Sequence, residues 1–305
     1  MACGAGRRVV ISQSLAYALA AMAAYGVSDF IYKQAAAAGI RADHFLMGQA
    51  WFFAPLVTLY ALATGTLVLD PAALWGSFAG LFVFAGLYYF VRSLAAGAVS
   101  TNASIFRLNF IVTAILAIAF LGEPLNAAKV AGLALALTAT WLLLGAAAPK
   151  AARGAAPVPD TTEVADPVRR RSLVDVTVAT LAFGASNFFH TVGLRHGAVP
   201  ETLAVAQATA FVPLATSVVF WRDRKRPPPV TFRYGAVAAI ALLAATILLL
   251  RSVVQGQASV LVPIAQMGFI VAALLGIFVL REPVTLRKAG GLATALAALA
   301  MLAAS

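Results

Sequence analysis

Charged residues and cysteine are both scarce in this 305-residue sequence. Asp, Glu, Lys and Arg make up 11% of the chain, whereas 62% of it is apolar and the mean hydropathy is +0.91. Soluble domains carry roughly 25% charged residues, so this chain cannot cover itself with polar surface in water. The one cysteine, Cys3, excludes a disulfide framework and a thiolate metal site.

Motifs for catalysis and for nucleotide hydrolysis are also missing. The chain has three histidines and contains neither HExxH, CxxC nor the phosphate-binding pattern GxxxxGK[ST]. An enzyme needs a clustered nucleophile, base or metal set, and an ATP-driven pump needs a phosphate loop. The sequence therefore predicts no enzymatic activity, no cofactor and no metal site.

Long apolar stretches are what the sequence has instead. A bilayer-spanning helix needs about 20 mostly apolar residues, and ten such stretches follow one another with short connections. The predicted fold class is an all-α integral membrane protein with ten transmembrane helices. The expected spans are residues 13–36, 43–63, 72–95, 99–121, 125–147, 173–194, 200–220, 231–251, 256–280 and 285–304.

A polar segment divides this series of spans into two halves. Residues 148–172 contain four prolines, three acidic and five basic residues, a composition typical of a solvated linker. We therefore expect a first five-helix repeat at residues 1–147, a polar linker at 148–172 and a second five-helix repeat at 173–305.

The two halves match each other in sequence after a shift of 158 residues, which becomes 159 from the third span onward. The matched pairs that chance explains least are Gln49 with Gln207, Pro55 with Pro213, Arg92 with Arg251, Glu123 with Glu282 and Lys129 with Lys288. Because each half has five spans, an odd number, the second half must enter the membrane from the opposite face. The sequence thus predicts two inverted repeats, a plan that several secondary transporters use.

A further match lies at the end of each half, where residues 111–137 read IVTAILAIAFLGEPLNAAKVAGLALAL and residues 270–296 read IVAALLGIFVLREPVTLRKAGGLATAL. In these segments the sequence resembles the drug/metabolite transporter superfamily, specifically its ten-span EamA-type members. One departure is Arg281, where the family more often has glycine before the acidic residue. The resemblance covers nearly the whole chain except the linker.

The resemblance implies a secondary transporter, and we expect an exporter of small organic metabolites or drugs that works by alternating access. The superfamily carries amino acids, nucleotide derivatives, sugar phosphates, cationic drugs and lipid-linked precursors, so it does not define the substrate. An intramembrane enzyme and a lipid flippase or scramblase on the same scaffold are the alternative hypotheses.

Ionisable residues inside spans are costly in hydrocarbon and usually face a cavity or a partner. Asp29 and Lys33 lie one helical turn apart and could form a salt bridge near the end of a span. Alternatively, Asp29 binds a proton or a cation in an apolar cavity. Asp29 aligns with Asn187, so both halves keep a polar group while one keeps the charge, and His190 lies on the same side as Asn187.

Arg107 stands inside the fourth span with Asn109 nearby, and it aligns with Gln266 in the second half. A buried arginine usually has a carboxylate partner or binds an anionic ligand. Pairing with Asp29 and binding of a substrate carboxylate are therefore both open.

The matched glutamines precede matched prolines within a span. Pro55 and Pro213 are expected to kink their helices, and Gln49 and Gln207 either line a cavity or pack in the core.

Matched charged residues occur near span ends. Arg92 and Arg251 are expected to be structural anchors rather than gates, because arginine at a span end reaches the headgroups. Glu123 and Glu282 precede proline between the last two spans of each half, so each is expected to cap the helix that follows it.

Trp51 and Tyr88 either line an aromatic cavity or face lipid and core. The expected partners are a small-molecule substrate, the lipid bilayer and protons, with no nucleic acid, and the chain is expected to be a monomer or homodimer in the cell (inner or plasma) membrane. Basic residues of the linker and of the loop near residue 224 favour a cytoplasmic linker, whereas the resemblance implies cytoplasmic termini.

Overall fold

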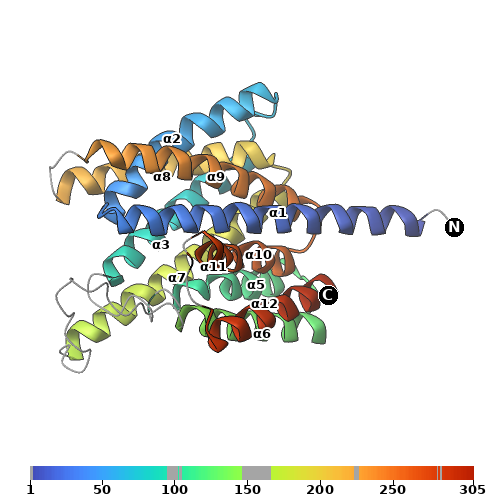
Figure 1. Ribbon diagram of the computed structural model, residues 1–305. Helices are drawn as coiled ribbons and strands as arrows, with labels where there is room; N and C mark the ends of the chain where they lie inside the picture. The colour runs from blue at the N-terminus through green and yellow to red at the C-terminus, as the bar shows by residue number, and fades with distance from the viewer. Residues whose placement is uncertain are drawn as a thin grey trace.

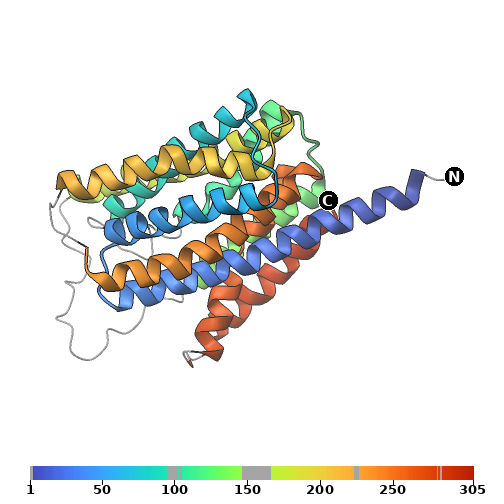
Figure 2. The same cartoon turned by 90° about the horizontal axis from the view of Figure 1, so that it is seen from above.

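A bundle of roughly aligned helices makes up the computed structural model, which describes residues 3–94, 102, 105–145, 166–222, 227–279, 281 and 284–305; no strand occurs in these ranges. The first half contains α1 (Cys3–Ala37), α2 (Ala42–Ala63), η1 (Pro71–Ala73), α3 (Leu74–Leu94), α5 (Asn109–Leu121) and α6 (Ala127–Gly145). The second half contains α7 (Asp166–Arg195), α8 (Pro200–Arg222), α9 (Pro229–Val254), α10 (Ala258–Gln266), α11 (Phe269–Phe278) and α12 (Leu286–Ala303). The N-terminal end of α1 projects beyond the other helices (Figures 1 and 2).

Eight helical segments in the described ranges are long and apolar enough to cross a membrane. Two further apolar helices, at residues 105–121 and 127–143, are shorter than a full span. They correspond to the fourth and fifth expected spans, so the number of ten spans stays a prediction. Helix α7 starts at Asp166, so it extends into the segment predicted as a linker.

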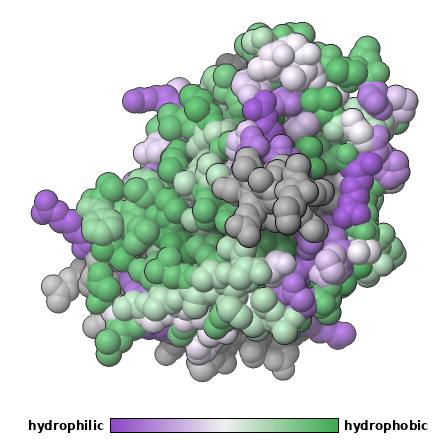
Figure 3. All heavy atoms as spheres, turned by 90° about the vertical axis from the view of Figure 1, so that its right-hand side faces the viewer, coloured by the Kyte–Doolittle hydropathy of each residue, from purple (hydrophilic) through white to green (hydrophobic). Residues whose placement is uncertain are grey.

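The surface of the bundle carries many large apolar side chains. Phe120, Trp141 and Phe278 are 72%, 64% and 77% exposed, and Figure 3 shows apolar atoms covering much of one face, with hydrophilic atoms in separate patches. Soluble monomers rarely expose apolar surface on this scale. The surface is thus suited to contact with lipid.

The contacts between the two halves are symmetric: when each helix is replaced by its equivalent in the other half, the main contacts are the same. Helix α1 packs on α9 as its counterpart α7 packs on α3, and α2 packs on α9 as α8 packs on α3. Two other large contacts pair a helix with its own counterpart, α2 with α8 and α6 with α12. In Figure 1, α1 and α7 run in opposite directions, as do α2 and α8.

Two glycines bring the halves into close contact at equivalent places. A Cβ atom added to Gly26 on α1 would lie 2.4 Å from the Cβ of Val271, and one added to Gly184 on α7 would lie 2.5 Å from the Cβ of Val112. Small residues let helix backbones approach closely inside a membrane. Glycine at these two positions therefore allows the first helix of each half to pack closely against the other half.

The fourth and ninth expected spans are each interrupted midway. The backbone N–H of Leu108 donates to the oxygen of Ile105 at 3.0 Å, and that of Met267 donates to the oxygen of Ile264 at 3.1 Å. Both are bonds to the third residue back, the tight turn of a 3₁₀-helix. The continuous helices expected over residues 99–121 and 256–280 are thus broken at equivalent points, and both breaks lie beside the site described next.

Arg281, which stands where the family more often has glycine, also has a backbone conformation that is unusual for a residue other than glycine. Arg281 has φ +52°, whereas Gly122, its equivalent in the first half, has φ +66°. Left-handed backbone is strained for a residue with a Cβ atom and costless for glycine. The two equivalent residues thus share left-handed backbone, which strains the arginine of the second half and not the glycine of the first.

Candidate functional site

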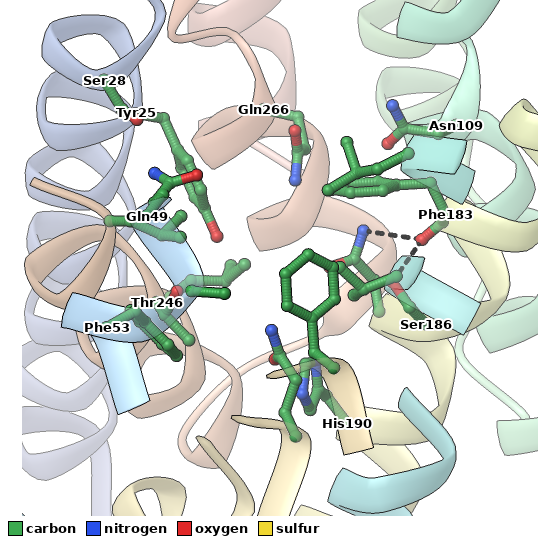
Figure 4. A pocket seen from close by; sticks show the side chains of 18 of the residues that line it. Tyr25, Ser28, Gln49, Phe53, Asn109, Phe183, Ser186, His190, Thr246 and Gln266 are labelled. Atoms are coloured by element: carbon green, nitrogen blue, oxygen red, sulfur yellow. Dashed lines mark hydrogen bonds between the residues drawn. The ribbon is translucent and has the colours of Figure 1, made fainter. Parts of the chain in front are cut away.

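A cavity of about 240 Å³ lies between the two halves. Helices α1, α2 and α3 and the interrupted segment around residue 107 contribute its walls from the first half, and α7, α8, α9 and α10 contribute from the second. In Figure 4, Tyr25, Gln49 and Phe53 lie on one side of the cavity and Asn109 and Phe183 on the other. The cavity is therefore a product of both repeats.

Most of the polar residues that the sequence singled out come together here. Those that line the cavity are Asp29, Gln49, Arg107, Asn109, Asn187, His190, Gln207 and Gln266. Because a polar side chain in a span has a high cost in lipid, its presence in the sequence was a usable signal.

Asp29 and Arg107 form an ion pair in the cavity wall. One Arg107 Nη atom lies 2.6 Å from an Asp29 carboxylate oxygen, and the two side chains are 23% and 24% exposed. The predicted pairing of Arg107 with Asp29 is thus present, and it joins α1 to the segment before α5. Lys33 lies further along α1, outside the residues that line the cavity.

Two amide side chains are held in fixed orientations by one hydrogen bond each. The hydroxyl of Tyr32 donates to Gln49 Oε1 at 2.6 Å, and Asn109 Nδ2 donates to the backbone oxygen of Phe106 at 2.8 Å. The other amide atoms, Gln49 Nε2 and Asn109 Oδ1, are buried without a hydrogen-bond partner in the described part of the chain.

Two further buried polar atoms belong to residues that line the same cavity. Gln207 Oε1 and His190 Nε2 have no partner of good hydrogen-bond geometry among the described residues, but both side chains line the cavity and interact with each other. A buried polar atom without a partner costs about 1–3 kcal/mol. Gln49 Nε2 and Asn109 Oδ1 therefore indicate a place that a polar molecule fills.

Aromatic rings form much of the remaining wall. Phe90 and Phe106 stack with ring centroids 4.2 Å apart, and Phe106 meets Phe183 edge to face at 5.2 Å. These rings, like those of Tyr25 and Tyr32, are not among the residues that the sequence singled out. No sequence signal separates them from other aromatic residues of the spans, because an aromatic ring suits lipid, core and cavity equally.

Trp51 and Tyr88 do not line this cavity, which favours the alternative that they face lipid or the core. Trp51 is 44% exposed, and its Nε1 donates to Thr216 Oγ1 at 2.8 Å. Tyr88 lines a smaller neighbouring pocket and stacks on Phe84.

Arg92 and Arg251 are ion-paired rather than extended toward headgroups. Arg92 binds both carboxylate oxygens of Asp175 at 2.8 Å, which links α3 to α7. Arg251 binds Glu201 at 2.6 Å and Tyr60 at 3.2 Å. Their matched positions therefore serve contacts between helices, and neither lines the cavity.

Glu123 caps a different helix from the one expected. Its carboxylate accepts hydrogen bonds from the backbone N–H groups of Ala258 and Ser259 at 2.9 and 2.8 Å, so it caps α10 in the second half instead of α6. Arg195 lies 3.1 Å from the same carboxylate. The sequence could not reveal this because the partner is distant in the chain; Glu282 falls outside the described residues.

Lys129, next to this cap, is fully buried. Its Nζ donates to the oxygen of Pro124 and to the side chains of Gln257 and Ser259, at 2.6 to 2.7 Å. All three donor positions of the ammonium group are thus used. Pro55 and Pro213 lie inside α2 and α8 as expected.

Comparison with known proteins gives two findings. The model of the EamA-like transporter family matches the chain twice, at residues 13–145 and 173–304. Among solved structures, a crystal structure matches with a TM-score of 0.75 at 15% identity, over 95% of this chain and 96% of the other; at that identity the likeness concerns the fold alone. No curated protein sequence matches significantly.

Proposed function

The chain belongs to the EamA-like transporter family, and we propose that it is a secondary transporter that moves small organic solutes across a membrane by alternating access between its two halves. The observation that carries this proposal is the cavity of about 240 Å³. Both halves line it, and both contribute a helix that is interrupted beside it. Secondary transporters with repeats bind substrates at such a seam, where helices are discontinuous.

An inverted arrangement of the repeats is part of the proposal. Ten spans, five from residues 1–147 and five from residues 173–305, would place the halves in opposite orientations across the bilayer. The antiparallel course of α1 and α7 supports this arrangement. Exchange of conformation between the halves then opens the cavity to one side of the membrane at a time.

Export with proton coupling through Asp29 is the more specific proposal. Asp29 is the one carboxylate among the described residues that line the cavity, and Arg107 neutralises it at 2.6 Å. Protonation of Asp29 would release Arg107, which gives a proton a way to change the charge distribution of the site. We place the chain in the cell membrane as a monomer or homodimer.

The test is solute movement in proteoliposomes that contain the purified protein, with and without a pH gradient. Saturable counterflow of a solute is expected, and a gradient of the correct sign should drive its accumulation. Turnover of a covalent bond without movement of the molecule would instead indicate an intramembrane enzyme. Non-saturable movement of labelled lipid would indicate a scramblase.

A further inference from the structure

We propose that the cavity selects an uncharged heteroaromatic molecule that carries a C=O acceptor on one side and an N–H donor on the opposite side. This inference rests on the proposed function and deepens it, because it gives the chemical class of the solute. It is drawn from three properties of the cavity, namely its charge, its unpaired polar atoms and its aromatic walls.

The cavity has no net formal charge to offer a ligand. Asp29 and Arg107 are the charged residues among its described lining residues, and they neutralise each other at 2.6 Å. A ligand with a net charge would lose its hydration on entering the cavity and would find no free opposite charge there, at a cost of several kcal/mol. A zwitterion would have to separate Asp29 from Arg107 to gain partners, so a neutral molecule loses least on entry.

The unpaired atoms require both a donor and an acceptor on the ligand. Gln49 Nε2 is a donor, because Gln49 Oε1 already accepts from Tyr32. Asn109 Oδ1 is an acceptor, because Asn109 Nδ2 already donates to Phe106. Figure 4 shows these two residues on opposite sides of the cavity, so the ligand must span it and present a C=O toward one side and an N–H toward the other.

Bulk water reaches both of these atoms poorly, because Gln49 and Asn109 are 4% and 1% exposed. A hydrogen bond from the ligand to each of these atoms therefore removes the penalty of an unpaired buried group.

The walls favour a flat ring of one or two cycles. Phe90, Phe106 and Phe183 present stacked and edge-on faces, the geometries in which aromatic pairs attract. A dry cavity of about 150 Å³ accommodates benzene, and this one, at about 240 Å³, has room for a two-ring molecule.

Equilibrium binding of labelled hypoxanthine to the purified full-length protein tests the inference. Hypoxanthine is neutral, has two rings and carries its C6=O group and its N9–H group on opposite sides of the ring system. We expect saturable binding that indole, L-phenylalanine and tetraphenylphosphonium displace poorly, because they lack the C=O acceptor, are zwitterionic or are cationic. The same solutes are then compared in proteoliposome counterflow.

Gln49→Met keeps the shape of the side chain and removes the donor. It should weaken hypoxanthine binding about tenfold, the effect of losing one hydrogen bond to a buried group. The matched control is Thr231→Val, because Thr231 is also fully buried with an unpaired Oγ1 but does not line the cavity. This control should bind hypoxanthine as the unaltered protein does.

Each outcome separates the solute class from the transport function. Hypoxanthine that binds without counterflow supports the solute class and contradicts the transporter. Counterflow of phenylalanine or tetraphenylphosphonium without hypoxanthine binding overturns the solute class and leaves the transporter standing. Absence of hypoxanthine binding, or equal binding by Gln49→Met and the unaltered protein, also overturns the solute class.

Discussion

At the scale of single residues, the Asp29–Arg107 pair concentrates the charge of the cavity. The pair is half-buried, and its atoms lie 2.6 Å apart. Removal of one partner from a buried pair leaves the other charge uncompensated. The cavity is thus neutral because of this pair, and a substitution of either member would give the cavity a net charge.

Asp29→Asn is expected to abolish pH-driven transport while the protein is still produced, because the amide cannot release and rebind a proton. The measurement is solute accumulation in proteoliposomes under an imposed pH gradient. The double variant Asp29→Asn with Arg107→Gln should recover any loss in Tm, because no charge is left unpaired, and should not recover coupling. Coupling that persists in either variant would remove Asp29 from the proton pathway.

Arg281→Gly is expected to raise stability by about 1 kcal/mol, because Arg281 adopts φ +52° and glycine has no Cβ atom to strain that backbone. The reverse change at the equivalent position, Gly122→Arg, should lower stability by a similar amount. Thermal unfolding of the purified variants measures both. A loss of stability in Arg281→Gly would show that the arginine side chain stabilises the turn by more than the backbone strain costs.

Single residues also show what the sequence could predict. Polar residues inside spans, such as Gln49 and Asn187, were predictable because lipid penalises them wherever they lack a cavity or partner. The rings of Phe90 and Phe106 were not, since an aromatic side chain is stable in either environment. The ion-pair partners Asp175 and Glu201 were also missed, because a sequence gives no distance between helices.

At the scale of helices, the start of α10 depends on a residue from the other half. The first N–H groups of a helix have no partner within it, and Glu123 supplies both carboxylate oxygens to Ala258 and Ser259. The apolar composition of residues 256–280 predicted a span here, and the segment Ala258–Phe278 is long and apolar enough to cross a membrane. From the sequence, Glu123 was expected to cap the helix that follows it, α6. In the structure the start of α10, which is distant in the chain, lies against Glu123 instead.

Glu123→Ala is expected to lower the free energy of unfolding by about 2 kcal/mol, because it leaves two buried N–H groups unpaired. The matched control is Asp70→Ala, which removes the cap of the exposed helix η1. Water can replace that cap, so its loss should be smaller. Thermal unfolding in one detergent compares the two variants, and equal losses would contradict the importance of burial.

At the scale of the whole molecule, the halves are held by close approach of backbone at Gly26 and Gly184. The equivalence of the two contacts, with Val271 and Val112, follows from the repeat. The repeat was readable from the sequence because matched residues are separated by 158 and then by 159 residues, and the family model matches the chain twice, at residues 13–145 and 173–304. The number of complete spans was not, since two helices in the described ranges fall short of the length that apolar composition indicated.

Gly26→Ala is expected to destabilise the protein by about 2 kcal/mol, because the added Cβ would lie 2.4 Å from Val271 and overpacking forces the helices apart. The control is Gly290→Ala in α12, where nothing lies within 4 Å of the added atom. That change should be neutral or stabilise the helix by up to about 1 kcal/mol. Chemical unfolding monitored by tryptophan fluorescence measures both, and similar values would exclude tight packing at α1.

The interleaving of the halves, with α1 on α9 and α7 on α3, has a consequence for a half-length chain. A half produced alone would leave these faces bare, so we expect it to associate with a second copy, which the proposed inverted arrangement would insert in the opposite orientation. In the full chain the two halves differ at the site, where Asp29 and Arg107 of the first half correspond to Asn187 and Gln266 of the second.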